Sequence, residues 1–273
     1  GDFSHENRLK KNPVPCVFRV DVAKRGPGEV FIGKLGSPGK DKDLLTAPCG
    51  LTVAGGMLYV ADHRGDRVVV FKEVDRSFVG EIKVKTPDTL GVDPTSGAVY
   101  VCSLVNQNTP AEIIKFDGYK NGKELYRISL PPTGQYGHHR IAVDASAKPV
   151  RIWVPSGYLG SPISLCCIED AGDKLVNKGD PRSKELSAGG PRDLSVDHLR
   201  NELYVKANSS FHRIDDLTGK VKDTLPMDTP QRSMAYGLQV VAGIDGNFYG
   251  DVFGAVGAAG SGLWRFDRQG KPL

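Results

Sequence analysis

The chain has 273 residues, of which 39% are hydrophobic, and it carries a net charge of +4 with 33 glycines and 18 prolines. It lacks an apolar run near the roughly 20 residues that a membrane-spanning helix needs. Its mild charge is unlike the strongly one-signed surface of a dedicated nucleic-acid binder, and its glycine and proline content predicts many turns.

The first predicted element is a loop or N-terminal extension at residues 1–15. Two strands follow it, CVFRVD at residues 16–21 and EVFIGKL at residues 29–35. Phe18-Arg19-Val20-Asp21 has a pattern of apolar, basic, apolar and acidic residues that returns later in the chain. We therefore interpret residues 16–35 as the last two strands of a repeating unit.

A meander of short strands then repeats along the chain. Its second strand carries an aromatic residue at positions 59, 100, 153, 204 and 249, in steps of 41, 53, 51 and 45. A short strand precedes each aromatic residue. These first strands read GLTVA, TLGVD, RIAVD, DLSVD and GLQVV.

The third predicted strand of the unit repeats the pattern of residues 18–21 at residues 114–117, 212–215 and 264–267. Fourth strands follow, of which ELYRISL at residues 124–130 and VKDTL at residues 221–225 are the clearest. Four antiparallel strands in a unit of this length predict an all-β protein, a β-propeller of four-stranded blades.

The strand count leaves the number of blades open. Two strands, four complete blades and three further strands give 21 strands. We favour six blades in a piece of a longer polypeptide, with five as the alternative, in which EVFIGKL completes the last blade and CVFRVD is unexplained. The propeller is expected over residues 16–273, with blades near residues 16–46, 47–86, 87–135, 136–188, 189–234 and 235–273.

One blade resembles the NHL repeat, on the residues Pro48, Gly50, Leu51, Leu58 to Asp62 and Asp66 to Phe71. The other blades keep the strands but lose the link from Asp62 to Arg67. The chain is thus similar to NHL and related six-bladed propellers. The resemblance implies a fold rather than an activity.

Cysteine and histidine give the sequence no metal-binding motif. The five cysteines include neither C-x-x-C nor a Cys/His knuckle, so we expect small buried hydrophobes with one disulfide at most. His138 and His139 would face opposite ways on a strand, and His63 is predicted to lie on the surface. No metal or cofactor is predicted, with calcium or zinc in the central channel as the alternative.

Aligned first strands bring five polar residues to one predicted position at the mouth of the channel. They would converge there, either as an ordinary solvated lining, which is the interpretation we favour, or as a pocket with a few directed polar groups. These residues are Cys49, Asp88, His139, Arg192 and Tyr236, and the next position holds Gly50, Thr89, Arg140, Asp193 and Gly237.

Within that pocket, Arg192 and Arg140 would hold an anionic ligand through charge-assisted hydrogen bonds. Tyr236, Asp193, Cys49 and Thr89 complete the candidate ligand-binding set. His139 and Asp88 are the candidates for a general base and the group that orients it. The sequence shows neither a phosphate loop nor a Ser/His/Asp motif.

The function we expect is a non-catalytic binding scaffold that presents its loops to a protein, a carbohydrate or a small anionic ligand. Long connections such as SLVNQNTPA and PSGYLGSPI favour it. The resemblance implies an alternative, a lactonase-like or amidating-lyase-like enzyme that uses the channel, and RNA binding as a minor one. The resemblance also suggests a bacterial extracellular or periplasmic location.

Overall fold

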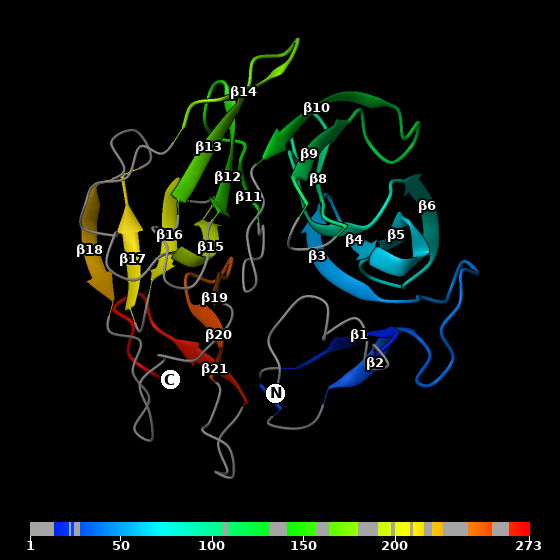
Figure 1. The fold of residues 1–273 in the computed structure, drawn as a ribbon. Helices are drawn as coiled ribbons and strands as arrows, with labels where there is room; N and C mark the ends of the chain where they lie inside the picture. Colours follow the sequence, from blue (N-terminus) through cyan, green and yellow to red (C-terminus); the bar gives the residue numbers. More distant parts are fainter. Residues whose placement is uncertain are drawn as a thin grey trace. The chain divides into compact units, whose positions relative to one another are not determined.

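The computed structural model divides the chain into two compact units, residues 1–139 and residues 140–273 (Figure 1). No helix among the described residues has the length and apolar character to cross a membrane. The described residues are 14–21, 23–24, 28–105, 109–130, 141–156, 164–179, 191–197, 200–207, 210–215, 220–225, 240–252 and 262–273.

The first unit contains three antiparallel sheets, drawn from blue to green in Figure 1. In the two four-stranded sheets, every strand pairs with the next strand along the chain. The sheets are β1 (Cys16–Arg19) with β2 (Glu29–Gly33); β3 (Pro48–Ala54), β4 (Met57–Asp62), β5 (Arg67–Lys72) and β6 (Phe78–Lys83); and β7 (Pro87–Val92), β8 (Val99–Ser103), β9 (Ala111–Phe116) and β10 (Glu124–Leu130). A 3₁₀ turn, η1 (His63–Gly65), joins β4 to β5.

The second unit repeats this meander. Its sheets are β11 (Ala142–Asp144), β12 (Val150–Ser156), β13 (Ser164–Asp170) and β14 (Leu175–Asn177); β15 (Pro191–Asp197), β16 (Glu202–Ala207), β17 (Ser210–Ile214) and β18 (Val221–Leu225); and β19 (Val240–Ala242), β20 (Phe248–Val252) and β21 (Gly262–Phe266). Strand β19 is described only from residue 240, so the earlier part of the predicted strand GLQVV lies outside the described residues.

The described residues hold 21 strands, the number that the sequence predicts. Nineteen of them form five blades, four with four strands and one with three, so the preference for six blades is corrected to five. The strand EVFIGKL, which the five-blade alternative assigned to the last blade, is β2 and pairs with β1 instead. CVFRVD, which the five-blade interpretation left unexplained, contributes β1. It pairs with β2 in a separate two-stranded sheet, from Cys16 opposite Gly33 to Arg19 opposite Glu29.

Burial on both sides explains why some strands are apolar without interruption. Strand β5 reads RVVVFK, and its first five residues are buried. Val68 and Val70 pack against β7–β10 residues such as Val101, whereas Val69 and Phe71 pack in the cluster that contains Val17. Because alternate residues of a strand point to opposite faces, a sheet between two neighbours needs apolar residues at every position.

The second unit shows the same division of side chains. Leu203 and Val205 of β16 pack with Trp153 of β12. The intervening Tyr204 turns to the other face, where its ring stacks on Phe211 at a centroid separation of 5.1 Å. Phe248 of β20 meets the Tyr204 ring edge-on at 4.9 Å. Aromatic side chains therefore fill the space between the last two blades.

Aspartates after the third-strand pattern close the turns that follow. The Asp21 carboxylate accepts a hydrogen bond from the Ala23 N–H at 3.0 Å. Asp117 accepts one from the Lys123 N–H at 2.9 Å, and Asp267 accepts one from Gln269 at the same distance. Such bonds fix a turn locally. All five cysteines lie within the described residues, and they are thiols rather than disulfide halves.

Candidate functional site

Three chemically different side chains meet in the first unit. Cys49 lies on β3, His63 in the turn η1, and Asp88 on β7 of the next blade. The sulfur, a ring nitrogen and a carboxylate oxygen of these residues all lie within 4.8 Å of one another. His63 and Asp88 are 5% exposed, whereas Cys49 is half-buried. We call this group the Cys–His–Asp cluster.

The backbones of two neighbouring first strands come into contact at the cluster. A Cβ atom on Gly50 would lie 2.6 Å from the Asp88 carbonyl oxygen and 2.8 Å from the Thr89 Cα. Such distances are far below a van der Waals contact, so only glycine allows this approach. It brings Cys49, the residue before Gly50, to the side chain of Asp88.

A register shift marks the same point on both strands. In β3, Pro48 lies opposite Asp62, but the next pair is Leu51 with Val60, which leaves Cys49 and Gly50 out of the regular ladder. In β7 the pairing passes from Pro87 to Thr89 and leaves Asp88 out. Bulges of this kind redirect a side chain and are frequent beside functional sites.

The bulges have a sequence signal, Pro-x-x-Leu at the start of a first strand. It reads PCGL at residues 48–51 and PDTL at residues 87–90. A third copy, PRDL at residues 191–194, starts β15, where the register shifts between Pro191 and Asp193. Proline has no N–H to donate to a ladder, and it is confined in sheets to such starts and irregularities.

His63 is buried, which corrects the prediction that it lies on the surface. Its backbone N–H donates to the Ala47 carbonyl at 3.0 Å. Its ring Nδ1 lies 3.2 Å from the Pro87 carbonyl oxygen. Since a carbonyl only accepts, Nδ1 carries the proton in this bond, and in the neutral imidazole Nε2 holds the lone pair. The short turn between β4 and β5 folds inward because both its backbone and its side chain are bound there.

The Cys49 sulfur lies 3.6 Å from the same Ala47 carbonyl that His63 binds. Asp88 also lies close to the fully buried Cys102. Burial raises the pKa of the Cys102 thiol well above its ordinary value, the Asp88 charge raises it further, and a hydrogen bond with Thr89 acts in the opposite direction. Cys102 therefore stays a neutral thiol beside Asp88. Thr89, a candidate ligand-binding residue, faces Cys102.

The remaining candidate residues are placed only in part. The Asp193 carboxylate accepts a hydrogen bond from the Val240 N–H at 2.8 Å, and thereby connects the first strands of two blades. His139, Arg140 and Tyr236 lie outside the described residues, as does the side chain of Arg192, whose backbone is in β15. The ligand-binding roles of this set stay a prediction.

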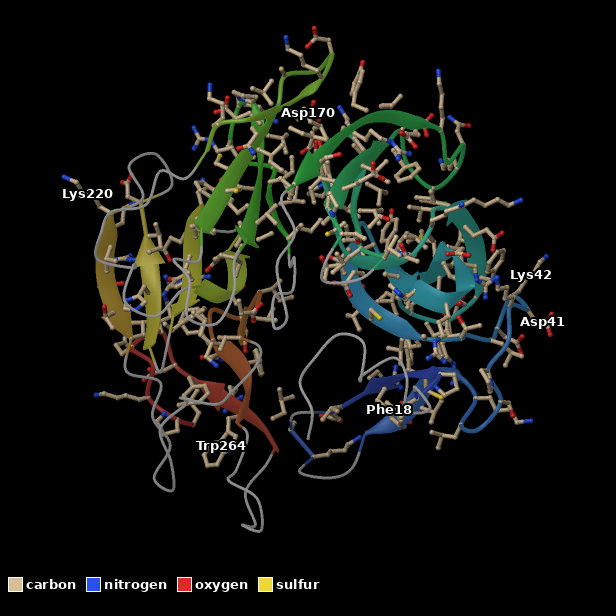
Figure 2. The ribbon with its side chains drawn as sticks, in the orientation of Figure 1. Phe18, Asp41, Lys42, Asp170, Lys220 and Trp264 are labelled. Atoms are coloured by element: carbon tan, nitrogen blue, oxygen red, sulfur yellow. The ribbon has the colours of Figure 1, made fainter. Side chains whose placement is uncertain are left out.

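A buried ion pair, Arg67 with Asp62, holds the loop that leads into the cluster. The Arg67 side chain is 6% exposed, and its Nε lies 3.3 Å from an oxygen of the fully buried Asp62 carboxylate. The guanidinium also donates to the carbonyls of Lys40 at 2.6 Å and Leu44 at 2.9 Å. Figure 2 labels Asp41 in this segment, between β2 and β3.

The Asp62 carboxylate completes the attachment of the loop. Its other oxygen accepts hydrogen bonds from the backbone N–H groups of Thr46 and Ala47, both at 2.8 Å. Asp62 and Arg67 are the residues of the NHL-like blade whose spacing the other blades lack. Their role is structural, because every one of these contacts is made within the loop and its own blade.

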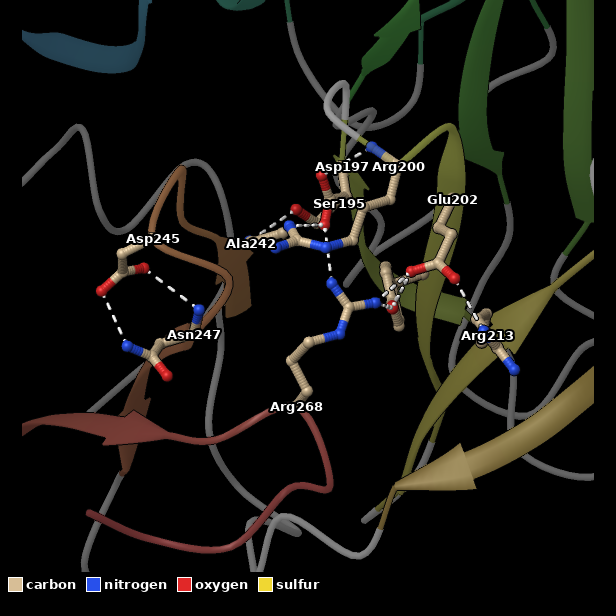
Figure 3. A network of polar contacts seen from close by, with 10 residues as sticks. Ser195, Asp197, Arg200, Glu202, Arg213, Ala242, Asp245, Asn247 and Arg268 are labelled. Carbon is tan, nitrogen blue, oxygen red and sulfur yellow. Dashed lines mark hydrogen bonds and ion pairs between the residues drawn. The ribbon is translucent and has the colours of Figure 1, made fainter.

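Figure 3 shows a second polar network, in the second unit, with Glu202 of β16 among its members. The Glu202 carboxylate accepts hydrogen bonds from Tyr204, Arg213 and Arg268, each at 2.6 Å. Burial raises the pKa of Glu202, but these three bonds outweigh it and leave the pKa below its ordinary value. The bond from Arg268 joins the turn after β21 to the neighbouring blade. The network stabilises the packing of two blades.

Comparisons with known proteins identify the fold. No family model matches the chain, and no curated protein matches its sequence. A solved chain from a nidogen/laminin complex has a TM-score of 0.64 at 12% identity, covering 96% of this chain and 90% of that one. The β-propeller domain of Cps50 (Swd1) from Myceliophteria thermophila has a TM-score of 0.51 at 10% identity, covering 81% and 71%.

A chain of hydrazine synthase from Kuenenia stuttgartiensis is also similar, with a TM-score of 0.53 at 15% identity, covering 87% of this chain and 69% of that one. At such identities the likeness concerns the fold alone. The protein is thus an all-β β-propeller with four-stranded antiparallel blades.

Proposed function

We propose that this propeller is a non-catalytic scaffold that binds a protein partner through one edge of its blades. The proposal depends on the lengths of the connections between strands, which differ between the two edges of the blades. The connections between first and second strands have two to six residues, whereas three of the connections between second and third strands have seven to nine, at residues 104–110, 157–163 and 253–261.

The antiparallel order of the strands places the longer connections at one edge of the blades. Successive strands run in opposite directions, so all connections from second to third strands emerge at the same edge of their blades. At the opposite edge, two of the turns between first and second strands are fixed by their own carboxylates. Asp93 accepts a hydrogen bond from the Thr95 N–H at 2.9 Å, and Asp245 accepts one from Asn247 at 3.0 Å.

Long connections on a rigid frame are where binding sites concentrate in folded proteins. One of the similar structures comes from a nidogen/laminin complex, in which proteins bind one another. This supports protein binding for the present chain by analogy of fold. The mixed surface charge, at +4 over 273 residues, agrees with a protein partner better than with nucleic acid.

The proposal is tested with the full chain and one loop variant. In the variant, residues 105–110 are replaced by a two-residue Asn-Gly linker, which keeps the fully buried Leu104. Both proteins are screened for binding on arrays of extracellular proteins and glycans, and for turnover of a panel of lactones and esters. We expect a protein ligand whose binding falls at least tenfold in the variant, and no turnover.

A matched control changes the opposite edge. Replacing the Thr95-Ser96-Gly97 turn by Asn-Gly leaves the long connections intact and should keep the binding. Equal loss in both variants, or saturable turnover of a lactone or ester, would overturn the scaffold proposal.

The Cys–His–Asp cluster favours one other function, that of a propeller hydrolase or lyase. A thiol beside an imidazole, with a carboxylate close to both, is a set of groups used in nucleophilic catalysis. If the protein is such an enzyme, turnover in the same panel is lost in Cys49→Ala and kept in Cys16→Ala, whose thiol lies on β1 outside the cluster.

A further inference from the structure

We propose that Cys49, His63 and Asp88 bind one Zn²⁺ ion, a site that goes beyond the scaffold function and does not depend on it. The three residues are separated in sequence and come from two blades. They offer one sulfur, one nitrogen and one oxygen, with the three atoms within 4.8 Å of one another.

The chemistry of the donors selects the metal. Zinc binds thiolate, imidazole and carboxylate ligands, and sites with three protein ligands leave a fourth position for water or another molecule. Calcium and magnesium prefer oxygen ligands alone, and calcium takes about six to eight of them. A site with a cysteine sulfur and a histidine nitrogen therefore favours zinc over either.

The spacing of the donors needs only a small contraction. In a tetrahedral site with bonds of about 2.0–2.3 Å, the ligand atoms lie roughly 3.5 Å apart. The upper limit of 4.8 Å in the cluster is about 1 Å wider. Small rotations about the χ angles of the three side chains move the donor atoms by about this much, without a change in the backbone.

The His63 ring makes the hydrogen bond that is typical of metal-binding histidines. Metal-binding histidines almost always donate their second ring N–H to a carbonyl or carboxylate, which fixes the tautomer and the ring. Here Nδ1 lies 3.2 Å from the Pro87 carbonyl, so in the neutral imidazole that binds a metal the lone pair is on Nε2. Pro87 immediately precedes Asp88, and one short segment of β7 therefore orients one proposed ligand and supplies another.

The backbone around the proposed ligands is held by contacts that do not involve a metal. The close approach of Gly50 to Asp88 joins β3 to β7, and the Ala47 carbonyl accepts from His63 and lies beside the Cys49 sulfur. Since Cys49 is half-buried, while His63 and Asp88 are buried, an ion would reach the site from the Cys49 side.

The test is a titration of the metal-stripped full chain with Zn²⁺ and, in parallel, with Co²⁺ as a spectroscopic probe. We expect one equivalent of Zn²⁺ to bind, and Co²⁺ to give a thiolate-to-cobalt charge-transfer band in the near ultraviolet. Cys49→Ala should abolish the band. His63→Gln and Asp88→Asn should each weaken binding by more than the roughly 10- to 100-fold that the loss of a second-shell partner costs.

Cys16→Ala, a change at a buried thiol on another strand, is the matched control and should keep both the stoichiometry and the band. Circular dichroism establishes that each variant is folded. A measurement on the unaltered chain needs no variant: Zn²⁺ should slow the alkylation of Cys49 at least tenfold. The proposal is wrong if Cys49→Ala binds Zn²⁺ as tightly as the unaltered chain, or if Zn²⁺ does not protect Cys49.

Discussion

Gly50 lies so close to Asp88 that a methyl group on residue 50 would stand 2.6 Å from the Asp88 carbonyl oxygen. This contact joins the first strands of two blades at the point where each leaves its regular ladder. The position of the Cys–His–Asp cluster therefore depends on a residue that has no side chain.

We predict that Gly50→Ala destabilises the protein by about 1–3 kcal/mol, the usual cost of forcing extra atoms into a packed site. The obstacle is backbone, which cannot turn aside as a flexible side chain could. Gly80→Ala on β6 is the control, since its Cβ would meet the Tyr119 ring at an ordinary 3.4 Å. Urea unfolding measures both changes. Equal, small effects would show that the two strands are not in contact.

The Arg67–Asp62 pair predicts a large loss of stability on substitution. Arg67→Met leaves the fully buried Asp62 carboxylate without its cation, and breaking a buried pair in this way costs about 3–5 kcal/mol. Arg67→Lys should not restore the stability, because an ammonium cannot reproduce the contacts of a planar guanidinium with separate carbonyls.

Arg127→Met, which breaks an exposed ion pair, is the control for Arg67→Met. Its ion pairs with Glu112 and Glu124 involve a side chain that is 48% exposed. Exposed pairs contribute about 0–1 kcal/mol, so the midpoint of urea unfolding should change little. A similar loss in the Arg127 and Arg67 variants would contradict the structural role of the buried pair.

Glu202 predicts a dependence of stability on pH. Its pKa in the folded protein is lowered, so the ionised carboxylate stabilises the fold at every pH above the ordinary value of a glutamate. This contribution is lost as the pH falls through the lowered pKa. The free-energy difference between the unaltered protein and Glu202→Gln should therefore be larger at pH 7 than at pH 3. A constant difference would exclude the proposed hydrogen bonds to the carboxylate.

The five thiols should differ in reactivity. Cys49 is half-buried, whereas Cys16, Cys102, Cys166 and Cys167 are buried, and the pKa of Cys102 is raised by burial and by Asp88. Because the thiolate is the reactive form, N-ethylmaleimide should modify Cys49 first and Cys102 among the last. Peptide mapping by mass spectrometry measures the order. Early modification of Cys102 would contradict its complete burial.

The strands could be predicted because their signals are local. Alternation, aromatic residues and aspartates at strand ends are visible in a few neighbouring residues, and the predicted strand ELYRISL has the same bounds as β10, Glu124–Leu130. The number of blades depends on which sheet the first strands join. That choice depends on pairing between strands, and no short pattern in CVFRVD predicts its partner.

The cluster is harder to predict, for a reason that His63 illustrates. Its surroundings, DHRGDR, read as a short exposed turn, and the adjacent Arg64 and Asp66 are indeed exposed. The imidazole is buried only because the next blade supplies the Pro87 carbonyl, 24 residues further along the chain. The signal that the sequence does contain is the repeated Pro-x-x-Leu, whose second residue is Cys49 in one blade and Asp88 in the next.

The most direct test of the account is X-ray absorption at the zinc edge, measured on the full chain loaded with one equivalent of Zn²⁺. We predict a first shell of one sulfur at about 2.3 Å together with nitrogen and oxygen atoms at about 2.0–2.1 Å, and the loss of that sulfur in Cys49→Ala. A shell without sulfur, or a sulfur that persists in the Cys49 variant, would contradict the claim that neighbouring blades assemble this site.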